Sequence, residues 1–318
     1  MPTPITGEEQ VKKSNRVWLQ RLPIVLLAMV GAGILLYPSI SDWFATMAQQ
    51  QLYGEYSQKV SEMSEAERQS YLDAASDYNE HLPNGPLRDP YVLTDDGKTV
   101  DSRESYLEYL KQLDFGDGLP MAWVEIPGIN VTLPIQHGTS DDTLEWSAGH
   151  LFGSALPVGG ESTHAVVAAH SGRANAKLFY ALDQLEEGDV FSVEVVGERF
   201  YYETRRIEVV DTEYFGDGVR QVQGEDHVTL LTCTPVGVNS HRLLVRGDRI
   251  PAPPGSADAT DIPVDKAVAS APWWIAGVSG APTLAWVGLA AADRRLVKRR
   301  SPAHPHQTSA CASHASQK

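Results

Sequence analysis

The sequence predicts an all-β domain of about 130 residues, a barrel or a sandwich, with helical segments ahead of it. Two observations support this prediction. From Met121 to Ile250 the chain consists mainly of short runs rich in β-branched and aromatic residues, and clusters of Gly, Pro, Asn or Asp separate most of them. Residues 42–82, in contrast, contain no proline and are rich in Gln, Glu, Ser, Ala and Leu. This composition is typical of helices.

The expected strands are short apolar runs between residues 121 and 250. They are MAWVEIP, VTLPIQ, HAVVAAH, VFSVEVV, RFYYETRRIEVV, HVTLLTC and HRLLVRGDRI. Between them one segment, KLFYALDQL at 177–185, has the pattern of a helix. The sequence contains neither an internal repeat nor a phosphate-binding glycine loop.

The segment before the strands is expected to form a helical stalk. Ser64 precedes Glu67 by three positions, a capping-box pattern that predicts the start of a helix there. The stretch HLPNGPLRDPYVLTDDG is dense in Pro, Gly, Asn and Asp and is predicted to be a loop. A short helix is expected over ESYLEYLKQL, and the Pro/Ala/Asp-rich sequence after Ile250 is typical of a linker.

Charge patterning suggests two membrane spans. The formal net charge of −15 argues against a nucleic-acid partner bound through its phosphates. Residues 22–41 and 267–292 carry no charge, and each segment is long enough to cross a bilayer. Basic residues lie before the first segment and after the second, which places both termini in the cytoplasm and residues 42–266 outside. The alternatives are a cleaved signal peptide for the first segment and a buried core helix for the second.

Only two cysteines occur, Cys233 and Cys311, which is too few for a disulfide scaffold and does not match a zinc-ligand spacing. We therefore expect no metal and no cofactor, and assign no role to Cys311. Cys233 ends the apolar run VTLLTC, and Arg242 follows it by nine residues. The turn TPVGVNS between them predicts a hairpin with both side chains facing each other at one rim.

A third candidate, His170, ends the apolar run AVVAAH, where a buried strand opens into a turn. A thiol, an imidazole and a guanidinium at strand ends could form an acyl-transfer site. Each residue also has an ordinary interpretation. Cys233 could be a small core residue, His170 a structural histidine, and Arg242 part of a solvated strand face. The combination of the three favours catalysis.

These segments resemble the sortase family. VTLLTCTPVGVNSHRLLVRGDRI is similar to the TLxTC motif of sortases with its downstream arginine, and PVGVNSHRLLVRG is similar to the version in pilin-polymerising class C members. AAHSGRANAKLFYALDQLEEGD resembles the segment that carries the family's histidine, and MAWVEIPGINVTLPIQHG resembles its opening strands. The resemblance covers residues 119–250. It implies an eight-stranded sortase-type β-barrel with Cys233 as nucleophile, His170 as general acid/base and Arg242 as stabiliser of the oxyanion.

The resemblance to class C also implies a lid. Its Asp-Pro-aromatic motif matches Asp89, Pro90 and Tyr91, which would place Asp89 near Arg242 and Tyr91 over Cys233. The chain departs from the class at three places. The family more often has Phe or Trp where Tyr91 stands, Val236 occupies a position that is commonly tyrosine, and the sequence Ser171-Gly172-Arg173 replaces an Arg-Gly pair.

The sequence therefore predicts a membrane-anchored cysteine transpeptidase with its catalytic domain outside the cell. Its partners would be pilins or other surface proteins with LPxTG-like sorting signals, and a pilin lysine would supply the amine. The alternatives are a housekeeping sortase that uses a cell-wall peptide amine, and an inactive sortase-like scaffold. The expected segments are a cytoplasmic N-terminus (1–21), a first span (22–41), a stalk and lid (42–118), the barrel (119–250), a linker (251–266), a second span (267–292) and a cytoplasmic tail (293–318).

Overall fold

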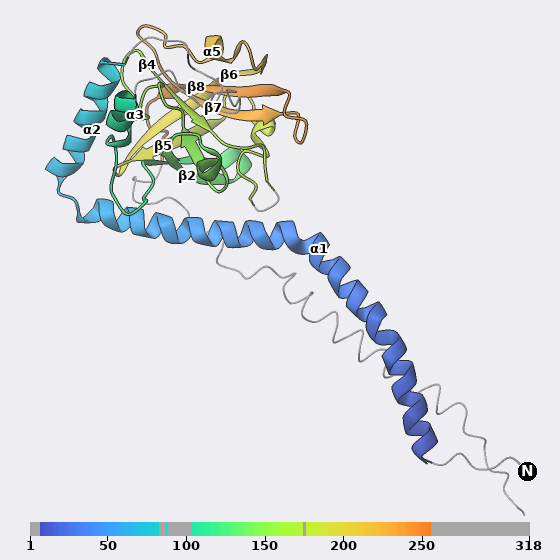
Figure 1. Ribbon diagram of the computed structural model, residues 1–318. Helices are drawn as coiled ribbons and strands as arrows, with labels where there is room; N and C mark the ends of the chain where they lie inside the picture. Colours follow the sequence, from blue (N-terminus) through green and yellow to red (C-terminus); the bar gives the residue numbers. More distant parts are fainter. Residues whose placement is uncertain (1–6, 83–86, 88–102, 174–175, 256–318) are drawn as a thin grey trace, which may run out of the picture. The chain divides into compact units, whose positions relative to one another are not determined.

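The computed structural model describes residues 7–82, 87, 103–173 and 176–255 (Figure 1). The described chain divides into two compact units, one ending at Ile34 and the other beginning at Leu35. The second unit contains all the strands of the described residues.

Eight strands form a closed barrel in the order β1-β2-β3-β4-β7-β8-β6-β5, which confirms the expected eight-stranded architecture. Neighbouring strands are antiparallel except for the parallel pairs β2–β3 and β4–β7. The strands are β1 (Ala122–Ile126), β2 (Val131–His137), β3 (Ala148–His150), β4 (Thr163–Ala168), β5 (Val190–Val195), β6 (Glu198–Asp211), β7 (Asp226–Thr234) and β8 (His241–Ile250).

All seven predicted strand runs overlap an observed strand. The eighth strand, β3, has only three residues and therefore no alternation that a sequence pattern could show. The helix predicted over 177–185 is wrong, because only the 3₁₀ turn η2 (Leu182–Gln184) forms there. Leu178 adopts a φ of 47°, a left-handed conformation that ends any α-helical path at that point.

Helices precede the barrel and fill some of its connections. α2 (Glu65–Glu80) begins at Ser64, whose hydroxyl accepts from the backbone N–H of Glu67 while the Glu67 carboxylate accepts from the Ser64 backbone, so the predicted capping box is confirmed. The short helix predicted near 104–113 is α3 (Arg103–Leu110). The connections contain α4 (Asp141–Leu144), α5 (Phe215–Gly218) and the 3₁₀ turn η1 (Pro127–Ile129).

α1 (Gly7–Glu62) is one continuous helix, and it includes the first part of the expected helical stalk. Within the described residues, no helix is both long enough and apolar enough to cross a membrane, so the expected first span at 22–41 is not supported. The expected second span at 267–292 lies outside the described residues.

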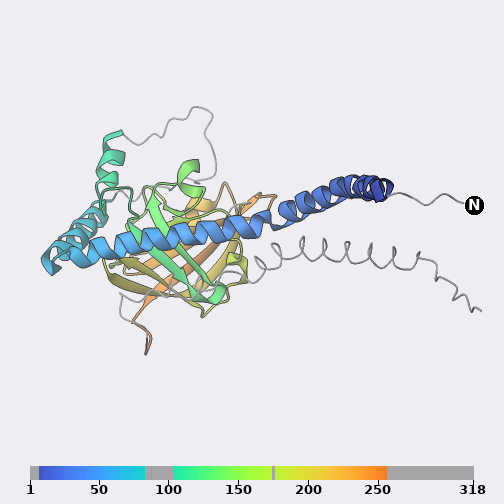
Figure 2. The same cartoon turned by 90° about the horizontal axis from the view of Figure 1, so that it is seen from below.

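The C-terminal part of α1 packs along the barrel (Figure 2). Tyr56 is fully buried and its hydroxyl accepts a hydrogen bond of 2.8 Å from the backbone N–H of Val196. Tyr53 stacks edge-on against Trp123 with a distance of 5.1 Å between ring centroids. Such aromatic side chains each bury a large apolar area, so this part of the stalk belongs to the core of the domain.

Candidate active site

The register of β7 and β8 places Cys233 directly opposite Arg242, as the hairpin prediction required. Both side chains are almost completely buried, with 5% of Cys233 and 4% of Arg242 exposed. Cys233 carries a thiol and is not part of a disulfide. A buried guanidinium needs compensating hydrogen bonds, because transferring it from water without partners is costly.

The loop between β7 and β8 supplies some of these bonds. Nη1 of Arg242 donates to the backbone carbonyl oxygens of Asn239 at 3.0 Å and His241 at 3.1 Å. Asn239 has a φ of 59°, a left-handed conformation that asparagine tolerates better than most residues. Backbone N–H groups of Val238 and Asn239 in turn donate to the carbonyl of Pro235. The loop therefore fixes the guanidinium beside Cys233.

His170 reaches the same end of the barrel from β4. The parallel pairing of β4 with β7 ends at Ala168 and Leu231, so His170 and Cys233 each lie two residues beyond the last registered pair. The backbone N–H of Ala169 donates to the Leu231 carbonyl, and the Thr232 hydroxyl donates to the Ala169 carbonyl, which continues the alignment. Parallel strands bring their carboxyl ends to one edge, and this brings the three predicted catalytic residues together.

Side-chain alternation places all three residues on the outer face of the barrel. In β4, β7 and β8 the intervening residues belong to the main core. The residues two positions before His170 and Cys233 and two after Arg242 belong instead to a second apolar cluster. This cluster, called here the outer cluster, consists of Leu151, Val166, Ala168, Phe215, Val219, Leu231 and Leu244. The three residues at the rim thus lie on the side of the strands that faces away from the main core, next to buried apolar side chains.

The loop that carries His170 is held at several points. The backbone N–H of Phe179, which is fully buried, donates to the His170 carbonyl at 3.0 Å. Gly172 has a φ of 89°, and a Cβ there would lie 2.9 Å from Cδ2 of Tyr180, so the turn requires glycine. Asp42 of α1 accepts from the Lys177 backbone N–H at 3.1 Å and pairs with its ammonium at 3.0 Å. The stalk helix therefore supports this loop directly.

The electrostatic environment favours a neutral imidazole. Burial lowers the pKa of His170, and the Arg173 cation lowers it further, while Asp141 raises it slightly. A neutral imidazole can accept a proton from a thiol. Ser171 donates to Oδ1 of Asn239 at 3.4 Å and so joins the histidine loop to the loop that holds Arg242.

The lid residues Asp89, Pro90 and Tyr91 lie outside the described residues. Leu87, two residues before the motif, is described, and it packs against the outer cluster. A Cβ at Gly216 would lie 3.0 Å from the Leu87 carbonyl oxygen, so the two backbones approach closely. In the part of the chain that the structure describes, no group of three or more His, Cys, Asp or Glu side chains is placed to bind a metal ion.

Sequence patterns did not indicate the outer cluster or the supporting contact from Asp42. Four residues of the outer cluster lie in expected strands to which no face was assigned, the other three lie outside every expected strand, and Asp42 lies far from His170 in sequence. For the left-handed conformation of Asn239 the sequence contains one weak indication. Asparagine followed by serine is typical of turns, and asparagine tolerates a positive φ.

Known proteins share both the sequence and the fold of the barrel. A protein-family model described as "Sortase domain" matches residues 124–250. Sortase D from Bacillus subtilis (strain 168) is 32% identical over 130 residues, which cover 40% of this chain. The match spans 62% of the length of that curated relative.

Solved structures resemble a larger part of the chain. Sortase C-1 from Actinomyces oris is 44% identical, with a TM-score of 0.54 over 58% of this chain and 99% of that one. Sortase C from Streptococcus pneumoniae is 39% identical, with a TM-score of 0.56 over 63% of this chain and 97% of that one. The Streptococcus pneumoniae structure bears on catalysis and on pilin substrate specificity in that enzyme.

Proposed function

Because this chain belongs to the sortase family and resembles class C sortases in structure, we propose that it is a cysteine transpeptidase that joins pilin subunits covalently. The observation that carries the proposal is the registered pair of Cys233 and Arg242, with His170 at the end of the neighbouring strand. The substrate class is a surface protein with an LPxTG-like sorting signal, and the second substrate is a lysine amine of another pilin.

In the acylation step, neutral His170 accepts the proton of the Cys233 thiol, and the thiolate attacks the Thr carbonyl of the sorting signal. Arg242 donates hydrogen bonds from its planar guanidinium to the oxyanion that develops. The C–N bond to Gly then breaks, and the imidazolium gives its proton to the leaving amine. The Thr acyl group is now held on sulfur as a thioester.

In the second step a lysine amine attacks the thioester. His170 accepts a proton from the attacking amine, the C–S bond breaks, and the proton returns to the sulfur of Cys233. The products are an amide between two proteins and the regenerated thiol. The two steps together require no oxidant, reductant or metal.

The outer cluster supports a peptide substrate with apolar side chains. Leu231 and Leu244 form a registered pair two residues from Cys233 and Arg242 on their strands. Two residues of extended chain span about 7 Å. The Leu and Pro of a sorting signal whose Thr lies at Cys233 would therefore come next to this apolar cluster, whose side chains are at most 5% exposed.

The test is ligation of a synthetic LPxTG-like peptide to a pilin domain by the full-length protein in detergent. Cys233→Ala should abolish both the thioacyl intermediate, observed by mass spectrometry, and the ligated product. The variant should remain folded, because one small buried group replaces another. Ligation by the folded alanine variant would contradict the proposal.

The same assay separates the two alternatives. A cell-wall peptide amine that outcompetes the pilin lysine would indicate a housekeeping function. Absence of any acyl adduct on the wild-type protein would indicate an inactive scaffold.

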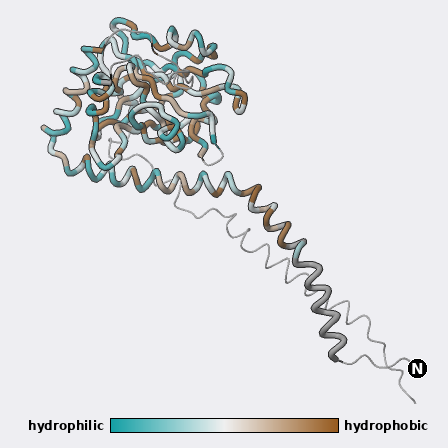
Figure 3. The backbone as a smooth tube through the Cα atoms, viewed as in Figure 1, coloured by the Kyte–Doolittle hydropathy of each residue, from teal (hydrophilic) through white to brown (hydrophobic). Residues whose placement is uncertain are grey.

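We also propose that the barrel lies outside the cell and that both termini are cytoplasmic. The basic flanks of residues 22–41 and 267–292 support this orientation. A hydrophobic stretch of α1 lies ahead of the part that packs on the barrel (Figure 3). Its exposed large apolar side chains are Leu26, Leu27, Met29, Val30, Ile34, Leu35 and Tyr37. Such a surface fits contact with lipid better than with water. Protease added to intact cells should digest the barrel, and full protection of the barrel would refute the orientation.

A further inference from the structure

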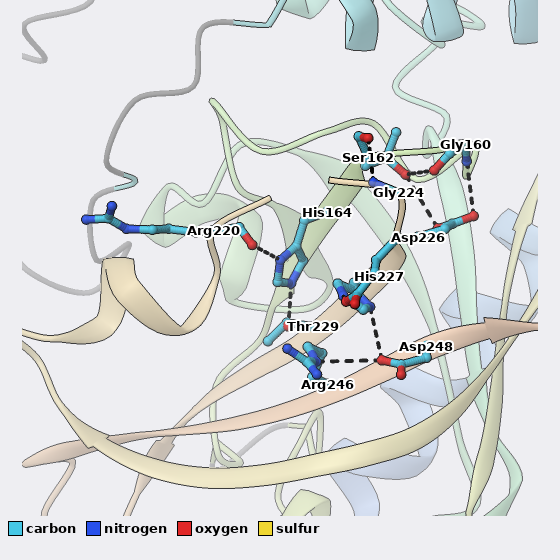
Figure 4. A network of polar contacts seen from close by, with 12 residues as sticks. Gly160, Ser162, His164, Arg220, Gly224, Asp226, His227, Thr229, Arg246 and Asp248 are labelled. Carbon is cyan, nitrogen blue, oxygen red and sulfur yellow. Dashed lines mark hydrogen bonds and ion pairs between the residues drawn. The ribbon is translucent and has the colours of Figure 1, made fainter. Parts of the chain in front are cut away.

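The outer face that carries the site continues into a polar network at the opposite ends of the same strands (Figure 4). His164, Val166, Ala168 and His170 alternate along one path from the start of β4 to the candidate site. The matching path on β7 runs through His227, Thr229, Leu231 and Cys233. The polar network and the catalytic residues therefore lie at two ends of one face of the β4–β7 pair, with the outer cluster between them.

His164 is the centre of this network. It is 1% exposed, its Nδ1 lies 2.9 Å from the Arg220 carbonyl oxygen, and its Nε2 lies 2.7 Å from the Thr229 hydroxyl. A carbonyl oxygen only accepts, so Nδ1 must carry the proton and donate it to Arg220. Burial lowers the pKa of His164 to about 4, so the ring is neutral at pH 7 and Nε2 accepts from Thr229. The tautomer is thus fixed by the two partners.

Arg220 belongs to the loop between β6 and β7, called here the β6–β7 loop (residues 212–225). Phe215 and Val219 from this loop are part of the outer cluster beside the candidate site. Further bonds hold the end of the loop near β4. Ser162 Oγ accepts from the Gly224 backbone N–H at 2.9 Å, and the Glu225 carbonyl accepts from the backbone N–H of Thr163 at 3.1 Å. Among the described side-chain hydrogen bonds to this loop, the bond from His164 reaches the residue next to Val219.

Charged side chains lie next to the hydrogen bond between His164 and Arg220. His227 lies between carboxylates, with its Nδ1 3.0 Å from Asp248, and its ring centroid is 5.4 Å from that of His164. Arg246 pairs with the same Asp248 at 3.6 Å. His227 and Arg246 both lower the pKa of His164 and so disfavour a second proton on its ring. The imidazole therefore stays neutral, and its single N–H donates to the Arg220 carbonyl.

We propose that His164 is a positioning residue for substrate binding. Its hydrogen bond to Arg220 holds the β6–β7 loop, and with it Phe215 and Val219, in place beside the candidate site, where the acyl-donor peptide is proposed to bind. This inference rests on the proposed function, because it concerns the binding of that peptide. His164 does not touch the reacting atoms, so its loss should affect binding of the peptide and leave the chemistry at Cys233 intact.

Two amide substitutions separate the roles of the two ring nitrogens. The amide nitrogen of asparagine can take the place of Nδ1, and that of glutamine lies nearer the place of Nε2. His164→Gln should raise the KM for the sorting peptide about three- to tenfold, the amount expected for one lost buried hydrogen bond. His164→Asn should restore a KM within about twofold of wild type. Both variants should keep kcat and the rate of Cys233 alkylation by a small thiol reagent.

Thr229→Val is the matched control, because it removes the other partner of His164 and leaves the Arg220 contact in place. It should lower the free energy of unfolding without raising the KM. A second measurement needs no substrate. Amide hydrogen exchange of residues 213–223 in the full-length protein should be faster in His164→Gln than in Thr229→Val and His164→Asn.

Each result decides the matter. A raised KM in His164→Gln with rescue by asparagine and faster exchange supports the inference. If His164→Gln leaves both the KM and the hydrogen exchange unchanged, the inference is overturned. It is also overturned if kcat of this variant falls by the same factor by which its KM rises. A wild-type protein that binds and cleaves no sorting peptide would contradict the proposed function, and the exchange data would still decide whether His164 holds the loop.

Discussion

A buried guanidinium shared by two carboxylates lies where α1 packs on the barrel. Arg199 donates to Glu125 at 3.2 Å and to Glu194 at 3.3 Å, and the Tyr53 hydroxyl donates to the same oxygen of Glu194 at 3.5 Å. The Glu194 side chain is 5% exposed. One cation cannot fully compensate two buried anions, so the second carboxylate is costly to ionise. Burial accordingly raises the pKa of Glu194 to about 7, although Arg199 lowers it.

The raised pKa makes stability depend on pH with a defined sign. Between the unfolded value of 4.5 and the folded value of about 7, the folded state binds more protons than the unfolded state. Stability contributed by protonated Glu194 is therefore present at low pH and is lost as the pH rises through this window. The loss between pH 5 and pH 8 is about 2 to 3 kcal/mol, since one pKa unit corresponds to about 1.4 kcal/mol.

Glu194→Gln keeps the shape and an acceptor for Arg199 but cannot ionise. We expect the variant to match wild type within about 1 kcal/mol at pH 5 and to exceed it by about 2 kcal/mol at pH 8. The assay is urea unfolding at several pH values, and the quantity compared is the difference between the two proteins. This difference cancels the contributions of His150 and His164, whose pKa values are lowered to about 4 and whose effect on stability has the opposite sign.

Glu108→Gln is the control, because Glu108 pairs with Lys111 on the exposed surface of α3. It should follow the wild-type curve at every pH. If the curves of Glu194→Gln and wild type run parallel from pH 5 to pH 8, Glu194 is ionised throughout and the reasoning from burial is wrong.

Two further predictions concern single side chains. Lysine at position 242 keeps the charge but loses the planar fork, so Arg242→Lys should lower kcat/KM about thirtyfold or more, and kinetics near those of wild type would show that Arg242 does not contact the reacting carbonyl. Asn79 of α2 makes two hydrogen bonds with the backbone of Leu156, at 3.0 and 2.7 Å. Asn79→Ala should cost about 2 to 4 kcal/mol in urea unfolding, because it leaves a buried N–H without its partner, and a loss below about 0.5 kcal/mol would contradict this.

The hairpin at the site could be predicted from local sequence alone. Cys233 and Arg242 are separated by a short turn rich in Pro, Gly and Asn, and a hairpin of that length determines which residues face each other. The capping box at Ser64 was predictable for the same reason, because all of its bonds join residues within four positions.

Contacts between distant segments could not be predicted in this way. Asp42 and Lys177 are 135 residues apart, and neither residue type marks a partner. The packing of Tyr53 and Tyr56 on the barrel was also hidden, because the α1 sequence is equally consistent with a stalk that stands alone. The helix predicted at 177–185 failed because tertiary contacts of Phe179 and Ala176 override a helical pattern that is only nine residues long.

The face of the strands on which the site lies could not be predicted from the sequence for a different reason. All six residues of β4 and seven of the nine in β7 are buried, since the core covers one face and the outer cluster covers much of the other. A strand buried on both faces has a continuous apolar sequence, so the sequence does not show which side chains point into the barrel and which point out of it. The polar residues His164, His227 and Thr229 break this uniformity, and all of them share a face with Cys233 and His170. A polar side chain in an otherwise apolar strand needs a partner outside the core. His164 binds the β6–β7 loop and Thr229, and His227 pairs with Asp248 of β8. The residues that interrupt the apolar runs therefore also identify the face on which the chemistry is proposed to occur.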